Sequence, residues 1–149
     1  MRAVVQRVRE ARVRVDNRVV GEIGRGLVVL LGVAKDDGPE DIAYLAPKIR
    51  DLRIFDDGGG RMNLALAEAG GAVLAVSQIT LYGDCRRGRR PSFDRAAGAE
   101  NGRVLFDAFV LELRGLGVTV DTGTYRAHMT VELVNDGPVT ILLDSRREF

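Results

Sequence analysis

The sequence is organised around Val131-Glu132-Leu133-Val134-Asn135-Asp136-Gly137-Pro138-Val139-Thr140-Ile141-Leu142-Leu143. Two strand-like apolar runs flank four residues that each favour turns, so a reversal between two strands, a hairpin, is expected here. Pro138 has no backbone N–H and Gly137 has no side chain, so the tip presents bare carbonyl groups on a rigid frame. An ordinary tight turn is the alternative interpretation of these four residues taken alone.

Composition narrows the class of protein. The chain has 149 residues, of which 46% are hydrophobic, and this favours one domain over residues 1–149 with a substantial core. No window approaches the roughly 18–20 apolar residues of a membrane span, and the N-terminus lacks the apolar region of a signal peptide. A single cysteine, Cys85, excludes an intrachain disulfide framework, so a cytoplasmic location is expected. The net charge of +1 gives no global attraction to nucleic acid.

The order of the expected elements predicts a mixed α/β fold with mainly antiparallel strand pairs and two main helices. Alternation of arginine and valine around Val13 indicates a half-buried first strand, and an unbroken aliphatic run indicates a buried central one. Pro47 interrupts the first helical pattern and should kink or shorten that helix. The predicted strands cover residues 2–15, 19–23, 27–33, 52–55, 72–76 and 118–120, and the predicted helices begin near residue 39 and cover about 98–116.

Polar groups follow the buried strand at 72–76. The strand passes directly into Ser77-Gln78-Ile79-Thr80-Leu81, which places hydroxyl and amide groups at the rim of a sheet. Sites are often built at such strand ends. The alternative is that Ser77 and Thr80 simply occupy the outer face of the strand.

A dense cluster of positive charge follows. Four guanidinium groups in five residues suit phosphate binding, although a solvated loop is an equally good interpretation. The four residues are Arg86, Arg87, Arg89 and Arg90.

Conventional hydrolytic chemistry has few candidates. Cys85 and His128 are the only residues of their types, so a thiol nucleophile with a histidine base is conceivable. One histidine and one cysteine do not provide the ligand set of a zinc site, and phosphate-binding or nucleophile-elbow glycine motifs are absent. We expect no metal and no cofactor. An enzyme of this composition would act by positioning, by backbone donors and by a group on the substrate.

The combination of Ser77-Gln78-Ile79-Thr80-Leu81 with Asn135-Asp136-Gly137-Pro138-Val139-Thr140 resembles the D-aminoacyl-tRNA deacylase family. The resemblance extends over essentially the whole chain. Further matching segments are Val5-Gln6-Arg7-Val8, Gly32-Val33, Arg53-Ile54-Phe55, Met62-Asn63-Leu64 and Arg90-Pro91-Ser92-Phe93.

The resemblance implies a barrel-like deacylase fold and a homodimer that hydrolyses the ester between a D-amino acid and the terminal adenosine of tRNA. It implies that Ser77, Ile79 and Met129 contact the substrate, and that Gln78 and Thr80 position it together with the backbone N–H groups of Ile79 and Thr80. No protein side chain would be the nucleophile, because family catalysis relies on the 2′-hydroxyl of the terminal ribose.

The resemblance also implies a cis bond between Gly137 and Pro138, whose carbonyl groups would reach into the partner subunit's site. There they would hold the substrate amino group and exclude an L side chain. Glycine would pass this filter, so glycyl-tRNA would also be cleaved. The arginines at 86, 87, 89 and 90 would contact tRNA, and no membrane is involved.

Three positions depart from the family pattern. Tyr125 stands where phenylalanine is usual in the segment before Met129, which is a mild change. Arg126 stands where the family usually has glycine, which could narrow the pocket or add a phosphate contact. Ile79 stands where phenylalanine is common. The competing hypotheses are a non-catalytic RNA-binding module that uses the arginine loop and a thiol hydrolase that uses Cys85 and His128.

Overall fold

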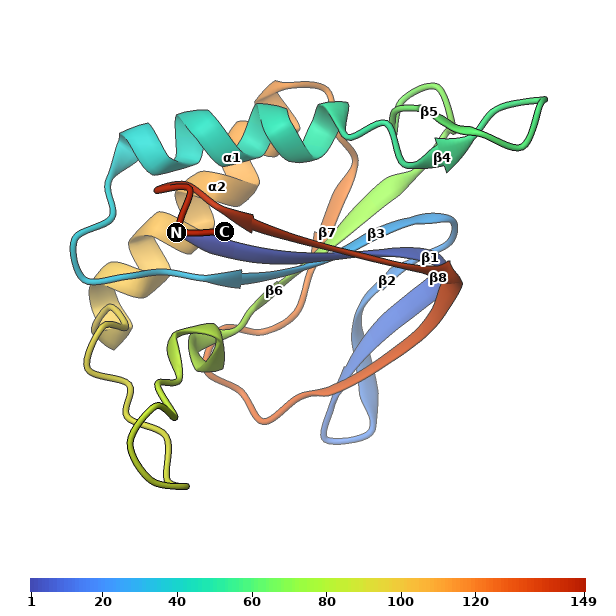
Figure 1. Cartoon of the computed structure of the whole chain (residues 1–149). Coiled ribbons are helices and arrows are strands. Elements are labelled where there is room, and N and C mark those ends of the chain that lie inside the picture. Colours follow the sequence, from blue (N-terminus) through green and yellow to red (C-terminus); the bar gives the residue numbers. More distant parts are fainter.

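Strand β1 (Arg2–Val15) is the centre of the sheet because three other strands pair with it. A computed structural model describes residues 1–149 (Figure 1). On one side β1 pairs with β3 (Gly26–Gly32) through its first half and with β2 (Arg18–Ile23) through its second half. On the other side it pairs with β8 (Thr130–Asp144), and all three pairings are antiparallel.

The rest of the main sheet is parallel and curls back toward β2. β3 pairs with β6 (Ala72–Ser77), which pairs with β7 (Val120–Thr122). The two edge strands, β2 and β7, then meet, since the N–H of Glu22 in β2 donates to Asp121 Oδ2 at 2.8 Å. Their backbones are so close that a Cβ added to Gly21 would lie 2.1 Å from the carbonyl oxygen of Thr122. Only glycine allows this approach. The sheet is therefore a nearly closed barrel, which confirms the expected mixed α/β, barrel-like fold.

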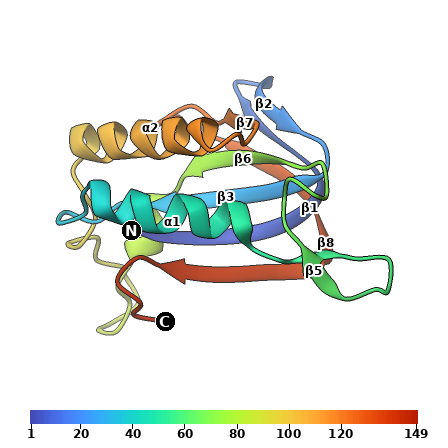
Figure 2. The ribbon, with the colours of Figure 1, turned by 90° about the horizontal axis from the view of Figure 1, so that it is seen from above.

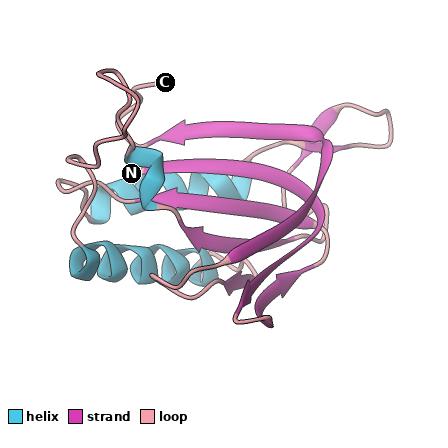
Figure 3. Cartoon of the chain, turned by 90° about the horizontal axis from the view of Figure 1, so that it is seen from below, coloured by secondary structure: helices cyan, strands magenta, loops and turns pink.

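Two helices, α1 (Pro39–Asp51) and α2 (Ala99–Gly115), cover the same face of the sheet. They lie in front of the strands in Figure 2 and behind them in Figure 3. The main core lies between helices and sheet, where Leu45, Phe55 and Phe109 are fully buried. A smaller apolar cluster lies inside the curl of the barrel, around Val13 and Val28. Neither helix has the length and hydrophobicity of a membrane span.

The prediction that Pro47 would shorten the first helix is wrong. α1 continues past Pro47 to Asp51. Proline removes one backbone hydrogen bond in a helix, but Leu45, Ala46 and Ile49 are all buried against the core around it. Packing of that apolar face stabilises the last turn in spite of the missing bond.

Two short strands are displaced from their predicted places. The strand predicted at 52–55 begins only at Phe55, because Leu52 caps α1; β4 (Phe55–Asp56) pairs with β5 (Met62–Leu64). The strand predicted at 118–120 begins at Val120, because the N–H of Val118 still bonds to Leu113 of α2. Both predictions misplace a helix end, where the local sequence is ambiguous.

The predicted reversal in the 131–143 stretch is also wrong. β8 is one continuous strand, and both of its halves pair with β1. Between paired positions Gln6–Thr140 and Val8–Asn135, β1 contributes only Arg7, whereas β8 contributes residues 136–139. The turn-forming residues therefore make a large bulge in a strand that keeps its direction. We call residues 136–139 the β8 bulge.

Candidate functional site

The Ser77–Thr80 segment leaves the sheet at the end of β6. Ser77 is the last residue of the strand, and the N–H of Gln78 donates to the carbonyl of Leu31 at 2.8 Å. A short 3₁₀ helix, η1 (Ile79–Tyr82), follows at once. The N–H groups of Ile79 and Thr80 begin this helix, and the first N–H groups of a helix have no partner within it. These two donors are therefore available to a ligand.

Of the polar residues of this segment, Ser77 and Gln78 are half-buried and Thr80 is exposed. The Gln78 amide donates to the Thr80 hydroxyl, and Thr80 lies at the surface. Ile79 is 51% exposed, which is unusual for a large apolar side chain. Close packing fixes the segment from behind, because a Cβ at Gly32 would lie 3.1 Å from the Gln78 carbonyl oxygen.

A small cavity of about 20 Å³ adjoins Ser77 and Ile79. Its other walls come from α2 and from the segment between β7 and β8, through Gly102 and Tyr125. The Tyr125 hydroxyl donates to the carbonyl of Ala99 at 2.9 Å, and burial raises its pKa. Tyr125 is not among the site residues predicted from the sequence. Its place in the segment that resembles the family just before Met129 is the only signal that could have found it.

Met129 does not line this cavity. Its sulfur packs against Gly123, because a Cβ added to Gly123 would lie 2.7 Å from the Met129 sulfur. The rest of the side chain packs against the small apolar cluster inside the barrel. The strand periodicity explains this, because Met129, Val131 and Leu133 share the inward face of the chain as it enters β8.

The β8 bulge presents its central residues to solvent. Gly137 and Pro138 are exposed, and the peptide bond between them is cis. Gly137 has φ +131°, and a Cβ there would lie 2.8 Å from Val139 Cγ2. The Asn135 carboxamide oxygen closes the bulge by accepting the N–H of Val139 at 2.9 Å. Glycine is required here both for its backbone conformation and for its missing side chain.

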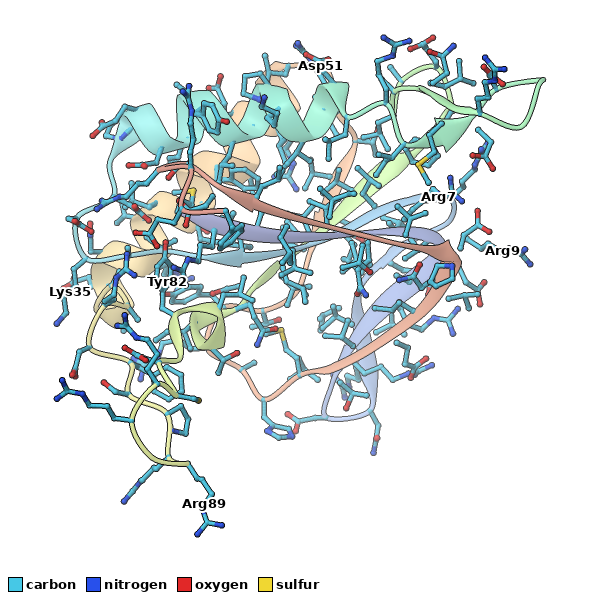
Figure 4. The ribbon with its side chains drawn as sticks, in the orientation of Figure 1. Arg7, Arg9, Lys35, Asp51, Tyr82 and Arg89 are labelled. Carbon is cyan, nitrogen blue, oxygen red and sulfur yellow. The ribbon has the colours of Figure 1, made fainter.

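Arg7 supports the bulge from inside the protein. It is only 6% exposed, which is unusual for an arginine. Its Nε donates to the Asp136 carbonyl at 3.0 Å, and its Nη1 donates to the Ile54 carbonyl at 2.7 Å. Figure 4 shows Arg7 pointing toward the β4 side of the molecule, close to the bend in β8. Arg7 therefore ties the bulge to the segment that precedes β4.

The two predicted motifs lie far apart in one chain. Register across the sheet places Ser77 beside Leu31, which pairs with Ala3, which pairs with Leu143. The bulge instead begins opposite Val8, which is level with Ala72 at the start of β6. Five strand residues cover about 16 Å, and three strand spacings separate the two motifs sideways. Figure 1 shows η1 and the bend of β8 at opposite ends of the sheet.

The arginine loop is exposed, but its four side chains are not equivalent. Arg86 folds back onto Asp84, with Nη2 and Oδ2 2.5 Å apart, and this pairing lowers the pKa of Asp84. No ion pair engages Arg87, Arg89 or Arg90. Arg89 extends from the tip of the loop in Figure 4. A cavity of about 580 Å³ opens between Arg86, Arg87 and Arg90, with two aspartates and Ser92 on its other side.

The thiol-hydrolase pair is not assembled. Cys85 lies in a depression with Arg2, Tyr82 and Arg95. His128 lies in the segment that leads into β8, and no hydrogen bond joins the two side chains. No group of three or more histidine, cysteine or carboxylate side chains is arranged to hold a metal ion.

Comparison with known proteins identifies the family. The family model described as D-Tyr-tRNA(Tyr) deacylase matches residues 4–144. The D-aminoacyl-tRNA deacylase of Anaeromyxobacter dehalogenans (strain 2CP-C) is 62% identical over 149 residues, covering 100% of both chains. The solved structure of the c-Myc DNA Unwinding Element Binding Protein matches with a TM-score of 0.91 and 35% identity, over 97% of this chain and 98% of that one.

A second solved structure, of a probable eukaryotic D-amino acid tRNA deacylase, matches with a TM-score of 0.75. At 21% identity, over 95% of this chain and 97% of the other, it supports the fold alone. Full-length identity to curated enzymes and the family model carry the assignment: this chain belongs to the D-aminoacyl-tRNA deacylase family of hydrolases.

Proposed function

We propose that the enzyme works as a homodimer in the cytoplasm and hydrolyses the ester of D-aminoacyl-tRNA in a site completed by two subunits. Ser77–Thr80 of one subunit receives the terminal adenosine and the ester, and the β8 bulge of the other subunit reaches over the amino acid. One observation carries this proposal. Ser77 and Gly137 lie at opposite ends of the sheet within one chain, so both can touch one substrate only if they come from different copies.

The bulge acts as a filter for chirality. The exposed carbonyl groups of Gly137 and Pro138 accept hydrogen bonds from the substrate amino group and occupy the space that an L side chain would need. Arg7 and Asn135 fix the residues on either side, Asp136 and Val139, and a rigid obstacle of this kind discriminates by exclusion. The amino acid side chain itself is not recognised, so many D-amino acids are substrates, and glycine also passes.

The chemical step needs little from side chains because an aminoacyl ester is already activated. The N–H groups of Ile79 and Thr80 stabilise the developing oxyanion, a contribution of about 3 kcal/mol for a single donor. Gln78 and Thr80, which are hydrogen bonded to each other, orient the ribose and the ester. The 2′-hydroxyl of the terminal ribose assists the reaction in place of a protein nucleophile.

A mixed dimer tests the shared site. One subunit carries Gln78→Ala and Thr80→Ala together, and the other carries Gly137→Ala; different affinity tags allow the mixed dimer to be purified. One of its two sites then combines both defects, and the other has neither. We expect about half of the wild-type rate on D-tyrosyl-tRNA, well above either parent dimer. A mixed dimer no more active than its parents, or a monomer in solution, would overturn the proposal.

Two substrate comparisons test the chemistry. D-tyrosyl-tRNA should be cleaved and L-tyrosyl-tRNA spared, so equal cleavage of both would contradict the filter. A tRNA that ends in 2′-deoxyadenosine should be cleaved far more slowly. Loss of turnover with intact tRNA binding in both Ser77→Ala and Thr80→Ala would instead indicate a side-chain nucleophile.

A non-catalytic nucleic-acid-binding role is a second candidate. It is favoured by the exposed, unpaired Arg87, Arg89 and Arg90 and by the name of a structural relative, which describes a protein that binds a DNA element. These arginines would contact the tRNA backbone in either role. Binding that is strongly salt-dependent and indifferent to aminoacylation, without hydrolysis, would favour the second candidate.

A further inference from the structure

A large groove lies next to the small cavity at Ser77 and Ile79. It has a volume of about 540 Å³, within the range of roughly 300–1,000 Å³ that is typical of ligand sites. One wall is α2, including Arg103 and Arg114, and the other is the segment 122–125. Tyr125 lines both the groove and the small cavity, so the two spaces are neighbours that share this side chain.

Positive charge and aromatic surface are concentrated at that junction. The Arg103 guanidinium lies 5.9 Å from the centre of the Tyr125 ring, and the buried Phe106 ring packs 6.1 Å from it, so Tyr125 is the aromatic ring that remains accessible. Arg126 follows Tyr125 directly in the chain. Burial raises the pKa of the Tyr125 hydroxyl, and the charges of Arg126 and Arg103 act in the opposite direction. Aromatic rings that stack bases, beside cations that bind phosphate, are how proteins hold single-stranded nucleic acid.

Arg126 is held in a conformation that other residue types would adopt more easily. Its φ is +64°, at the third position of a turn closed by the N–H of Ala127 and the carbonyl of Thr124. Glycine or asparagine is usual at that position. The guanidinium is exposed, and no ion pair or side-chain hydrogen bond engages it. Arg126 therefore has a strained backbone, and its charge has no partner within the protein. Strained residues cluster at functional sites, so this combination points to a ligand.

We propose that the groove between α2 and residues 122–125 binds the nucleotide that precedes the terminal adenosine of the tRNA, with Arg103 and Arg126 holding the phosphate between these two nucleotides. This inference rests on the proposed function, because it requires the adenosine to lie at Ser77–Thr80. The connecting phosphate is then the one on the 5′ side of the terminal adenosine, and the groove lies across Tyr125 from the small cavity at Ser77 and Ile79. Asp107 also lines the groove and lies 3.9 Å from the Arg103 guanidinium, so it partly offsets the positive charge offered to the strand.

The experiment compares two substrates that differ only in the proposed contact. One is D-tyrosyl-tRNA, and the other is adenosine esterified with D-tyrosine, which has no preceding nucleotide. The variants are Arg126→Gly, which also suits the turn, and Arg103→Ala. For each variant, we divide kcat/KM on tRNA by kcat/KM on the adenosine ester, and this ratio should fall about fivefold near 0.1 M salt. The reason is that one phosphate contact to a single strand changes the slope of log affinity against log salt concentration by about 0.7.

Binding of uncharged tRNA provides an independent readout. The slope of log affinity against log salt should become shallower by about 0.7 in each variant. Asp107→Asn should act in the opposite direction and tighten binding, since it removes a negative charge from the groove. Lys48→Ala is the matched control, because Lys48 is an exposed cation on α1 that does not line the groove.

Two results would overturn the inference. Equal losses on both substrates would place the arginines at the adenosine itself, and unchanged tRNA binding in both variants would assign the groove to another partner, such as a protein. Failure of the proposed function has a different signature, because the wild-type protein would then cleave neither substrate.

Discussion

The β8 bulge and the Ser77–Thr80 segment are built in opposite ways. In the bulge, a buried arginine, an asparagine side chain and a tightly packed glycine fix an exposed main chain. At Ser77–Thr80, the backbone is anchored to the sheet, Ile79 and Thr80 are exposed, and the Gln78 amide and the Thr80 hydroxyl bond only to each other. The difference suits the roles proposed for them, because an obstacle that excludes a substrate must be rigid in advance, whereas a surface that receives one can remain open.

The largest effect is expected from Gly137→Ala. The new Cβ would meet Val139 Cγ2 at 2.8 Å and Arg7 Nη2 at 3.1 Å, at a φ of +131° that disfavours any side chain. We expect kcat/KM on D-tyrosyl-tRNA to fall about 100-fold, the cost of misplacing a positioning group by about 1 Å. Gly115→Ala is the control, because a Cβ at Gly115 meets nothing within 4 Å. Full activity in Gly137→Ala would show that the bulge does not touch the substrate.

Arg7→Met should have the largest effect on stability. It leaves the buried carbonyl of Ile54 and the carbonyl of Asp136 without their donor, so the free energy of unfolding should fall by about 2–3 kcal/mol. The preference for D over L substrate should fall as the bulge loosens. Urea unfolding measures the first effect and paired kinetics the second.

Arg9→Met is the matched control for Arg7. The Arg9 side chain is 75% exposed and also contacts Asp136, at 3.4 Å. Its loss should change the free energy of unfolding by less than about 0.5 kcal/mol. If the two variants were equally destabilised, burial of Arg7 would not be what holds the bulge.

Thr80→Val tests the open half of the comparison. It removes the hydroxyl that accepts the Gln78 amide but keeps nearly the same shape. We expect kcat/KM on D-tyrosyl-tRNA to fall about tenfold, which corresponds to about 1.4 kcal/mol. The free energy of unfolding should change by less than about 0.5 kcal/mol, because the site is exposed. A loss of stability as large as that of Arg7→Met would erase the distinction between the two regions.

The smallest effect on activity is expected at a third place, the start of α1. Burial raises the pKa of Asp41, but hydrogen bonds from Ser145 and from the Gly38 N–H outweigh it and lower the pKa below its usual value. The carboxylate therefore stabilises the fold above about pH 4, the unfolded value, and this contribution is lost as pH falls through the lower folded value.

In Asp41→Asn, the free energy of unfolding should consequently fall less steeply as the pH is lowered below about 4. At pH 7 it should cost about 1 kcal/mol, the usual value of a helix cap, without changing kcat/KM. Thermal unfolding between pH 3 and pH 7 is the measurement. If the variant lost stability toward pH 3 as steeply as the wild type, Asp41 would not be the group whose protonation destabilises the fold. A loss of activity would show that stability and catalysis are coupled in this fold.

Sequence patterns predicted the elements that depend on local periodicity. The alternation around Val13, the aliphatic run of β3 and the apolar stripe of α2 all lie where they were expected. The polar strand end at Ser77 was found in the same way. These features are set by neighbouring residues, so a single sequence contains them.

The remaining features depend on distant partners. Turn chemistry in the 131–143 stretch suits a hairpin and a bulge equally, and pairing of both halves with β1 decides between them. Arg7 looks like one more surface arginine, because the carbonyls that bury it are 129 and 47 residues away. The distance between the two motifs likewise requires the register of four strands.

The pairing of β8 with β1 on both sides of the bulge also affects tolerance to insertion and deletion. Opposite the bulge, β1 has only one residue, Arg7. The distance between the paired segments on either side of the bulge is therefore set by β1 and not by the length of residues 136–139. A residue added within the bulge would project outward and leave every flanking pair in place. A residue added to β1 at Arg7 would instead shift all later pairs and invert their faces. The β8 bulge can thus change in length without disturbing the sheet, whereas β1 cannot.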